Sequence, residues 1–248
     1  MLARANAFNY SIANRKSSDV VPEQGLGFKD DDIGGKIRPM EDINSEAMAC
    51  GREALRAAKT TQTADVHPGT PLGFNIEHDY YNTESGFDYI FHIGPAQIYL
   101  ARAPNEDLSM FNGTDGKWFK IASVTAAHDT QPNPDYWITY RQRRVNFTIP
   151  DATPPGKYLL RIEHFMSGDP APQWYINCAH VNVLGGGTGV IPESAYAMFP
   201  GSYKLDDPSI KMDYSIWNKP GALLNYVGPG PKIWNGKVSP TRKTSFIA

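Results

Sequence analysis

Short strand-like segments, separated by turns rich in proline and glycine, run through the chain from residue 70 to residue 184. Strands of this kind are rich in β-branched and aromatic residues and end where turn residues interrupt them. The 248 residues include 20 prolines and 22 glycines, which favours many short strands over a helical bundle. The expected strands are 70–77, 87–92, 96–102, 118–121, 144–149, 157–164 and 173–184.

Seven such strands without long helices predict an all-β fold, an immunoglobulin-like or fibronectin-like β-sandwich with long ordered loops. The alanine-rich stretch 44–58 is expected to hold a helical turn or two. The proline-rich stretch 185–236 has little periodicity, which predicts a long loop packed over the sandwich. The polar segment 1–36 is expected to be poorly ordered, so the predicted domain covers 37–236 and leaves a short tail at 237–248.

Charge and hydropathy argue against two classes of partner. The net charge of -2 offers no electrostatic basis for binding nucleic acid or an anionic membrane. No stretch approaches the roughly 18 apolar residues that a membrane-spanning helix needs. The first residues also lack the apolar core of a secretory signal peptide, so none is expected in the chain as given.

Two features nevertheless suit an oxidising compartment. Cys50 and Cys178 are the only cysteines, and an isolated pair suits one disulfide. Asn112 and Asn146 begin Asn-x-Ser/Thr sequons, as does Asn9, although such sequons often arise by chance. Asn112 and Asn146 are the predicted glycosylation sites.

Gln173 and Tyr175 are the first candidates for chemistry. They are two residues apart on an expected strand, so both side chains leave the same face. With His92 beside that face, the group offers an imidazole nitrogen, a phenol oxygen and an amide, which suits a redox metal and a bound oxygen species. Taken singly, each residue has an ordinary explanation, because strand histidines and tyrosines usually serve packing. The hypothesis therefore depends on their convergence.

Several motifs occur in a fixed order. The sequence reads His-Ile-Gly-Pro at 92–95, Trp-Phe-Lys-Ile at 118–121, Pro-Gly-Lys-Tyr-Leu-Leu-Arg-Ile-Glu at 155–163, Gln-Trp-Tyr-Ile-Asn-Cys at 173–178, Phe-Pro-Gly-Ser-Tyr at 199–203 and Pro-Gly-Pro-Lys-Ile-Trp-Asn-Gly at 229–236. In these motifs the chain resembles the fungal lytic polysaccharide monooxygenases of auxiliary activity family nine. The resemblance runs from about residue 37 to residue 236. It implies a secreted, monomeric copper enzyme that oxidises cellulose or a related β-glucan with an external electron donor.

The resemblance also implies roles for individual residues. One copper ion in a type-two site is held in this family by a histidine brace, made of an N-terminal histidine and a second histidine. His92 matches the second histidine, Tyr175 the distant axial ligand, and Gln173 the hydrogen-bonding group that orients the oxygen species. Cys50 and Cys178 match the family's disulfide.

A flat aromatic surface is the expected substrate-binding feature, because apolar sugar faces stack on aromatic rings. Tyr214, Trp217 and Tyr203 lie in the matching C-terminal loop and are the candidates. The alternative is that these rings pack the loop onto the sandwich. It is preferred for Tyr203 and Trp217 and stays open for Tyr214.

The chain departs from the family pattern in two places. No histidine stands at its start, and the first one is His67. The missing N-terminal histidine is explained either by a gene model that lacks its true first exon or by a protein without a complete brace. His164 directly follows the glutamate of the Leu-Leu-Arg-x-Glu motif and does not match the family's oxygen-handling histidine. A competing hypothesis is therefore a non-catalytic relative that binds polysaccharide or copper. The third hypothesis is a β-sandwich protein with an unrelated function.

Overall fold

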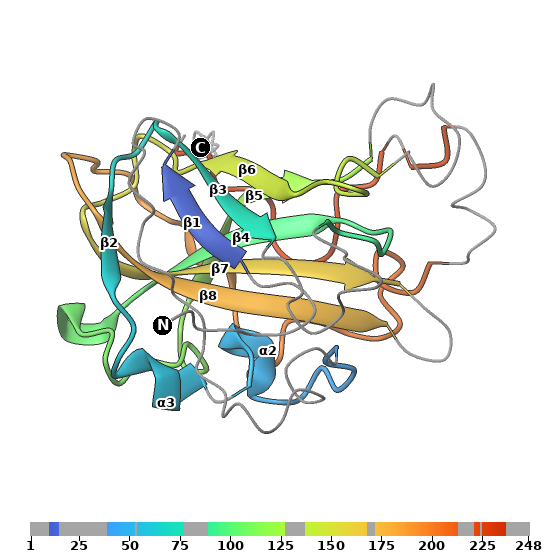
Figure 1. Ribbon diagram of the computed structural model, residues 1–248, viewed down its shortest axis with the longest axis horizontal. Helices are drawn as coiled ribbons and strands as arrows, with labels where there is room; N and C mark the ends of the chain where they lie inside the picture. The colour runs from blue at the N-terminus through green and yellow to red at the C-terminus, as the bar shows by residue number, and fades with distance from the viewer. Residues whose placement is uncertain are drawn as a thin grey trace, which may run out of the picture.

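Two β-sheets packed face to face form the body of the protein (Figure 1). The computed structural model describes residues 10–14, 39–52, 54–76, 89–126, 137–167, 172–212, 221–223 and 225–236. The small sheet has the order β1 (Tyr10–Asn14), β3 (Pro71–Ile76), β6 (Arg144–Thr148). The large sheet has the order β2 (Thr63–Val66), β8 (Gln173–Val183), β7 (Gly156–Met166), β4 (Ala96–Arg102), β5 (Trp118–Val124), β9 (Tyr196–Ala197). Neighbouring strands are antiparallel except β2, which runs parallel to β8.

The predicted β-sandwich is confirmed, and six of the seven expected strands correspond to β3 to β8. The exception is 87–92, whose described part, 89–92, has no regular strand structure. The expected poor order of 1–36 stays a prediction; of this segment the structure describes Tyr10–Asn14, which forms β1 and pairs with β3. The expected domain boundary at residue 37 stays a prediction, and the tail at 237–248 lies outside the described residues.

The central strands of the large sheet, β4, β7 and β8, are buried on both faces. On one face, alternate residues of β4 and β7, such as Ile98, Leu100 and Ile162, pack against the small sheet, where Phe74 and Phe147 stack with ring centroids 5.6 Å apart. The intervening residues point to the opposite face and are equally buried, so β4 is buried at six successive positions. A strand covered on one face only would alternate between apolar and polar residues.

Short helices and the C-terminal loop cover that opposite face. The helices are α2 (Ala47–Cys50) and α3 (Ala54–Ala58), which lie on the side of the large sheet away from the small one in Figure 1. Two 3-10 turns, η1 (Pro104–Glu106) and η2 (Glu193–Ala195), complete the regular elements of the described chain. The disulfide Cys50–Cys178 joins α2 to β8, as the sequence predicted, across 128 residues of chain.

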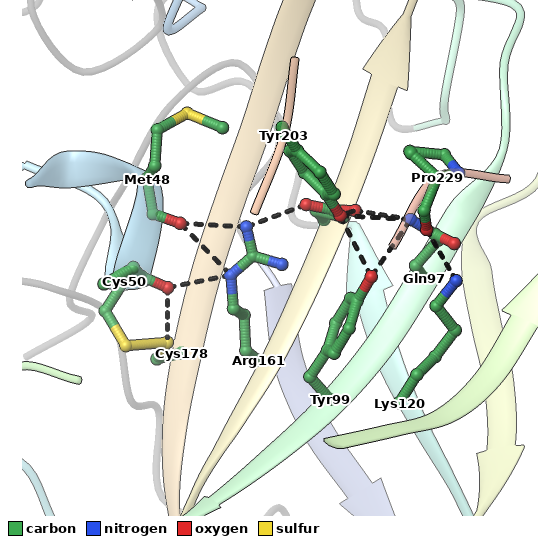
Figure 2. A network of polar contacts seen from close by, with 11 residues as sticks. Met48, Cys50, Gln97, Tyr99, Lys120, Arg161, Cys178, Tyr203 and Pro229 are labelled. Carbon is green, nitrogen blue, oxygen red and sulfur yellow. Dashed lines mark hydrogen bonds and ion pairs between the residues drawn. A yellow bond between two sulfur atoms is a disulfide. The ribbon is translucent and has the colours of Figure 1, made fainter. Parts of the chain in front are cut away.

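A buried polar network lies within this second layer (Figure 2). Arg161 pairs with Glu163 at 2.7 Å, and both side chains have no exposed surface. The guanidinium also donates to the carbonyl oxygens of Met48 and Ala49 in α2, at 2.9 and 2.8 Å. Gln97 donates to the Glu163 carboxylate at 2.6 Å. Buried charges are tolerated only when they are paired and hydrogen-bonded, and here each of the two charged groups has an ion-pair partner and hydrogen bonds, although Arg161 Nη1 has no hydrogen-bond partner among the described residues.

Lys120 on β5 connects the network to the C-terminal loop. Its ammonium donates to the Pro229 carbonyl oxygen at 2.6 Å and lies 5.7 Å from the centre of the Tyr99 ring. The Trp234 backbone N–H donates to the Lys120 carbonyl oxygen at 2.7 Å. Burial disfavours the charged amine and lowers the pKa of Lys120 from 10.5 to about 8, although the Glu163 carboxylate opposes this shift.

The lowered pKa of Lys120 predicts that stability rises with pH above neutrality. Below about pH 8 the amine is charged in both folded and unfolded chains, so its burial cost is present in full. As pH rises from about 8 toward 10.5, the folded chain loses this proton first, and the free energy of unfolding should increase by at most about 1.4 kcal/mol per pH unit. Denaturant titrations at about pH 7.5 and 9.5 measure this.

A Lys120→Met variant is the control for that prediction, because it removes the titrating group and keeps an unbranched side chain. In this variant the free energy of unfolding should no longer increase between about pH 7.5 and 9.5. The measurements stay below pH 10 because burial raises the pKa values of Tyr99 and Tyr203. Above pH 10 these tyrosines ionise first in the unfolded chain, so the free energy of unfolding falls. If the free energy of unfolding depended on pH in the same way in both proteins, Lys120 would not be the group responsible.

Among the described residues, no helix is long and apolar enough to cross a membrane.

Candidate functional site

His92 lies in the irregular segment that leads into β4, and hydrogen bonds hold this segment in place. The Thr139 hydroxyl donates to the Gly94 carbonyl oxygen at 2.5 Å, and the Phe165 N–H donates to the Pro95 carbonyl oxygen at 3.3 Å. Gly94 has φ +149°, and a Cβ there would lie 1.9 Å from the Phe165 carbonyl oxygen. Glycine is thus required for the segment to approach β7, and this approach positions His92.

Tyr175 brings the first residues of β8 to the same place. It lies opposite His164 of β7 in the antiparallel register, so the two side chains share the face toward the small sheet. The His92 ring stacks on Tyr175 with centroids 5.4 Å apart and planes 22° apart. The His164 ring lies 6.2 Å from the same tyrosine. Two imidazoles and one phenol therefore converge at this end of the large sheet.

Gln173 completes the predicted group. Two residues before Tyr175 on β8, it accepts a hydrogen bond from the Tyr175 hydroxyl through Oε1 at 3.2 Å. The side chain is half-buried, as is that of His92. The structure thus brings together His92, Gln173 and Tyr175, as their spacing and the motif resemblance predicted; their chemical roles stay predictions.

Burial keeps the titratable groups of this site neutral. It lowers the pKa of His92 and raises that of Tyr175. For His164 it lowers the pKa to about 3, and the nearby His92 acts in the same direction. His164 Nδ1 lies 3.0 Å from the Pro95 carbonyl oxygen, which only accepts, so this nitrogen carries the proton. The site presents neutral imidazole and protonated phenol, with no formal charge of its own.

Such donors fit part of a copper site, since imidazole nitrogen suits Cu(II) and a phenol oxygen suits a weak axial contact. His92 and Tyr175 are the donors that the structure describes. Within the described ranges, no three or more histidine, cysteine, aspartate or glutamate residues gather as a metal site. The resemblance implies a further, N-terminal histidine ligand, but residues 1–9 contain no histidine and the first histidine of the sequence is His67.

The predicted substrate-binding residues divide into two groups. Tyr214 and Trp217 lie outside the described residues. Tyr203 is a core residue: it is 5% exposed, its hydroxyl donates to the Glu163 carboxylate, and it lies 2.9 Å from the Tyr99 hydroxyl. A ring enclosed in this way presents no surface to a polysaccharide, so Tyr203 is removed from the substrate-binding candidates in favour of the packing alternative that was preferred for it.

Each predicted glycosylation site lies on an accessible part of the fold. Asn112 is half-buried in a turn, where its side-chain oxygen accepts a hydrogen bond from the Thr114 hydroxyl at 2.9 Å. Asn146 is exposed on β6 opposite Gly73. Modification of either residue stays a prediction.

His164 is the neighbour that the sequence did not assign to this site. The motif comparison placed it on a strand after the glutamate and gave it no role. Its position one residue after Glu163 puts it on the face opposite the buried ion pair, where it contacts both Pro95 and Tyr175. The alternation of strand residues is the signal that could have found it, once Tyr175 was placed on the neighbouring strand.

Comparison with known proteins extends these observations. Residues 8–223 match the model of Auxiliary Activity family 9 (formerly GH61). The chain is 44% identical over 209 residues to AA9 family lytic polysaccharide monooxygenase U of Thermothielavioides terrestris, covering 81% of this chain and 77% of that one. It is 35% identical over 204 residues to monooxygenase C of Emericella nidulans, with coverages of 80% and 79%.

Solved structures share the fold. The crystal structure of HiLPMO9B superposes with a TM-score of 0.70 at 21% identity and covers 94% of this chain and all of that one (100%). CvAA9A superposes with a TM-score of 0.63 at 25% identity, over 82% of this chain and 88% of its own. The fold is therefore common to proteins with low overall sequence identity.

Proposed function

Because the chain belongs to Auxiliary Activity family 9, whose members cleave polysaccharides oxidatively, we propose that it is a copper-dependent lytic polysaccharide monooxygenase acting on cellulose or a related β-glucan. Family membership makes the protein an oxidoreductase; the metal and the substrate are the proposed parts. The observation that carries them is the convergence of His92, Tyr175 and Gln173 at one end of the large sheet.

His92 and Tyr175 would hold the copper ion, together with the N-terminal histidine that the family resemblance implies. Bound copper would supply the one-electron redox chemistry that oxygen activation requires. Burial prepares His92 for this role, because a neutral imidazole offers a lone pair and an imidazolium does not. The hydrogen bond to Gln173 holds the Tyr175 hydroxyl in one orientation.

Gln173 is proposed to orient the oxidant. Its Oε1 accepts from Tyr175, which leaves the amide NH2 group as the end that donates hydrogen bonds. A donor held in place beside the reacting centre stabilises developing negative charge without reorganising during the reaction. His164 helps to hold His92 in position, since its hydrogen bond to the Pro95 carbonyl oxygen ties the His92 segment to β7.

The substrate is proposed to lie on a flat aromatic surface beside the copper site, as expected for a crystalline polysaccharide. Tyr214 and Trp217 remain the proposed contacts, through stacking on sugar rings. Secretion, a monomeric state and an external electron donor complete the proposal, by family resemblance.

Incubation of the purified native protein with cellulose, copper and a reductant tests this proposal. Oxidised oligosaccharides identified by mass spectrometry are expected, and N-terminal sequencing of the same material should reveal histidine. Omission of the reductant, and separately chelation of the metal, should each stop product formation. An N-terminus without histidine, tight adsorption to cellulose and no oxidised product would instead support the non-catalytic relative.

A further inference from the structure

A pocket of about 340 Å³ lies at the other end of the large sheet from His92. It is bounded by the end of β4, the start of β5 and the start of β7, with Arg102, Lys117 and Tyr158 among its lining residues. The candidate metal site lies at the start of β4, beside Ala96. The six residue steps of β4 between these ends span about 20 Å at the usual strand rise. The pocket is therefore separate from the site already described.

The inner part of this pocket is apolar and aromatic. Phe119 and Tyr158 are buried and meet edge to face, with ring centroids 6.3 Å apart. Tyr196 of β9, which is half-buried, meets Phe119 in the same way at 6.3 Å. The side chains of Phe111 and Ile191 extend the apolar lining. All these rings are held by strand pairing or core packing, so the lining is preformed, and its volume is within the range of small-ligand pockets.

The rim of the pocket is polar, with charges of both signs. Arg102 donates to Glu106 at 2.9 and 2.6 Å, and Lys117 donates to Glu193 at 2.8 and 3.0 Å. Asp115 is exposed at the same rim, and its carboxylate makes no hydrogen bond or ion pair with any described residue. Both cations are already matched by carboxylates, so the rim offers no excess of positive charge to an anionic ligand.

We propose that this pocket binds one or two pyranose units of a neutral glycan. A sugar ring presents an apolar C–H face to aromatic side chains and hydroxyl groups around its edge. Tyr196 would supply the aromatic contact, and the Asp115 carboxylate would accept hydrogen bonds from the hydroxyls. An anionic ligand would have to break an existing ion pair at the rim to reach Arg102 or Lys117, whereas a neutral polyhydroxylated ligand leaves both pairs intact.

The pocket would act as a second glycan contact, about 20 Å from the oxidising site by the strand rise used above. That the bound glycan is a β-glucan rests on the proposed function. That the pocket binds a sugar rests only on its lining residues. The predicted glycosylation site Asn112 lies one residue from Phe111, so an N-linked glycan of the protein itself could present the same sugar chemistry. The test therefore uses the full chain made in a host that attaches no N-glycans.

Titration of copper-free, ¹⁵N-labelled protein with cellohexaose tests the proposal. Saturable shifts of the backbone amide signals of Gly116, Lys117 and Tyr196 are expected. Tyr196→Ala should weaken this binding about tenfold, while Tyr196→Phe, which keeps the ring, should stay within about twofold. Asp115→Asn should weaken it about three- to tenfold through loss of a charged acceptor. Asp115 is exposed, so this variant tests the pocket without disturbing the core.

Asp206→Asn is the matched control, because Asp206 is equally exposed and lies outside the pocket lining. It should bind cellohexaose as the unaltered protein does. An anionic oligogalacturonate of similar length should bind more weakly than cellohexaose. The proposal is overturned if the three amides do not shift, if Asp115→Asn binds like the control, or if the anionic oligosaccharide binds more tightly.

Product analysis separates failure of this inference from failure of the proposed function. Oxidised products without the amide shifts would remove the pocket and leave the monooxygenase assignment. The amide shifts without oxidised products from native protein would support the pocket and remove the monooxygenase assignment.

Discussion

Replacement of His92 by alanine in the native protein is expected to reduce oxidised-product formation at least about a hundredfold, since even groups that only orient a metal ligand commonly contribute about 10- to 100-fold. His92 is the imidazole donor at the proposed copper site, and it stacks on Tyr175 at 5.4 Å between ring centroids. Copper that remains after loading and desalting, measured by elemental analysis, should fall in parallel.

His67→Ala is the control for this prediction. His67 is exposed in the turn between β2 and β3, so its loss should affect neither copper retention nor product formation. Comparable thermal unfolding of the two variants would show that the fold is intact. Retention of tightly bound copper by the His92 variant would remove His92 from the metal site.

Replacement of Arg161 by methionine is expected to lower the free energy of unfolding by about 3–5 kcal/mol. The change leaves the Glu163 carboxylate buried without its 2.7 Å partner and removes the donors to the Met48 and Ala49 carbonyl oxygens. Loss of one member of a buried pair costs far more than the pair itself contributes, because the remaining charge keeps its desolvation penalty. Denaturant titration at neutral pH measures the difference.

The double variant Arg161→Met, Glu163→Gln separates charge from packing. Glutamine removes the unpaired charge and keeps an oxygen that accepts from Gln97 and Tyr203. At least half of the lost stability should return. A single variant that loses less than about 1 kcal/mol, within the range of an exposed pair, would show that the ion pair is unimportant for stability.

Much of the fold was predictable because strand patterns are local. Short apolar segments ending in proline and glycine predicted six of the observed strands and the sandwich they form. The missed strands, β1, β2 and β9, are two to five residues long, too short for a pattern to show, and pairing with β3, β8 and β5 forms them. The expected strand at 87–92 was wrong in its described part, because Ile90 makes its backbone hydrogen bonds with the loop residues Arg141 and Gln142 and not with a neighbouring strand.

The candidate site was predictable in part for the same reason. Alternation along β8 places Gln173 and Tyr175 on one face, and the motif resemblance added His92. Tyr203 was a candidate for substrate binding from its place in the C-terminal loop, although packing was the preferred alternative, and the structure encloses it between Glu163 and Tyr99. The distal pocket went unpredicted, since its lining comes from four separate segments.

The sequence by itself determined six of the strands, which side chains share a strand face, and which two cysteines were available to pair. Only the tertiary structure decided which faces are covered. The central strands of the large sheet are buried on both sides because α2 and the C-terminal loop, distant along the chain, pack on the face away from the small sheet. The direction of a side chain depends on local backbone geometry, whereas its burial depends on segments that chain folding brings from elsewhere.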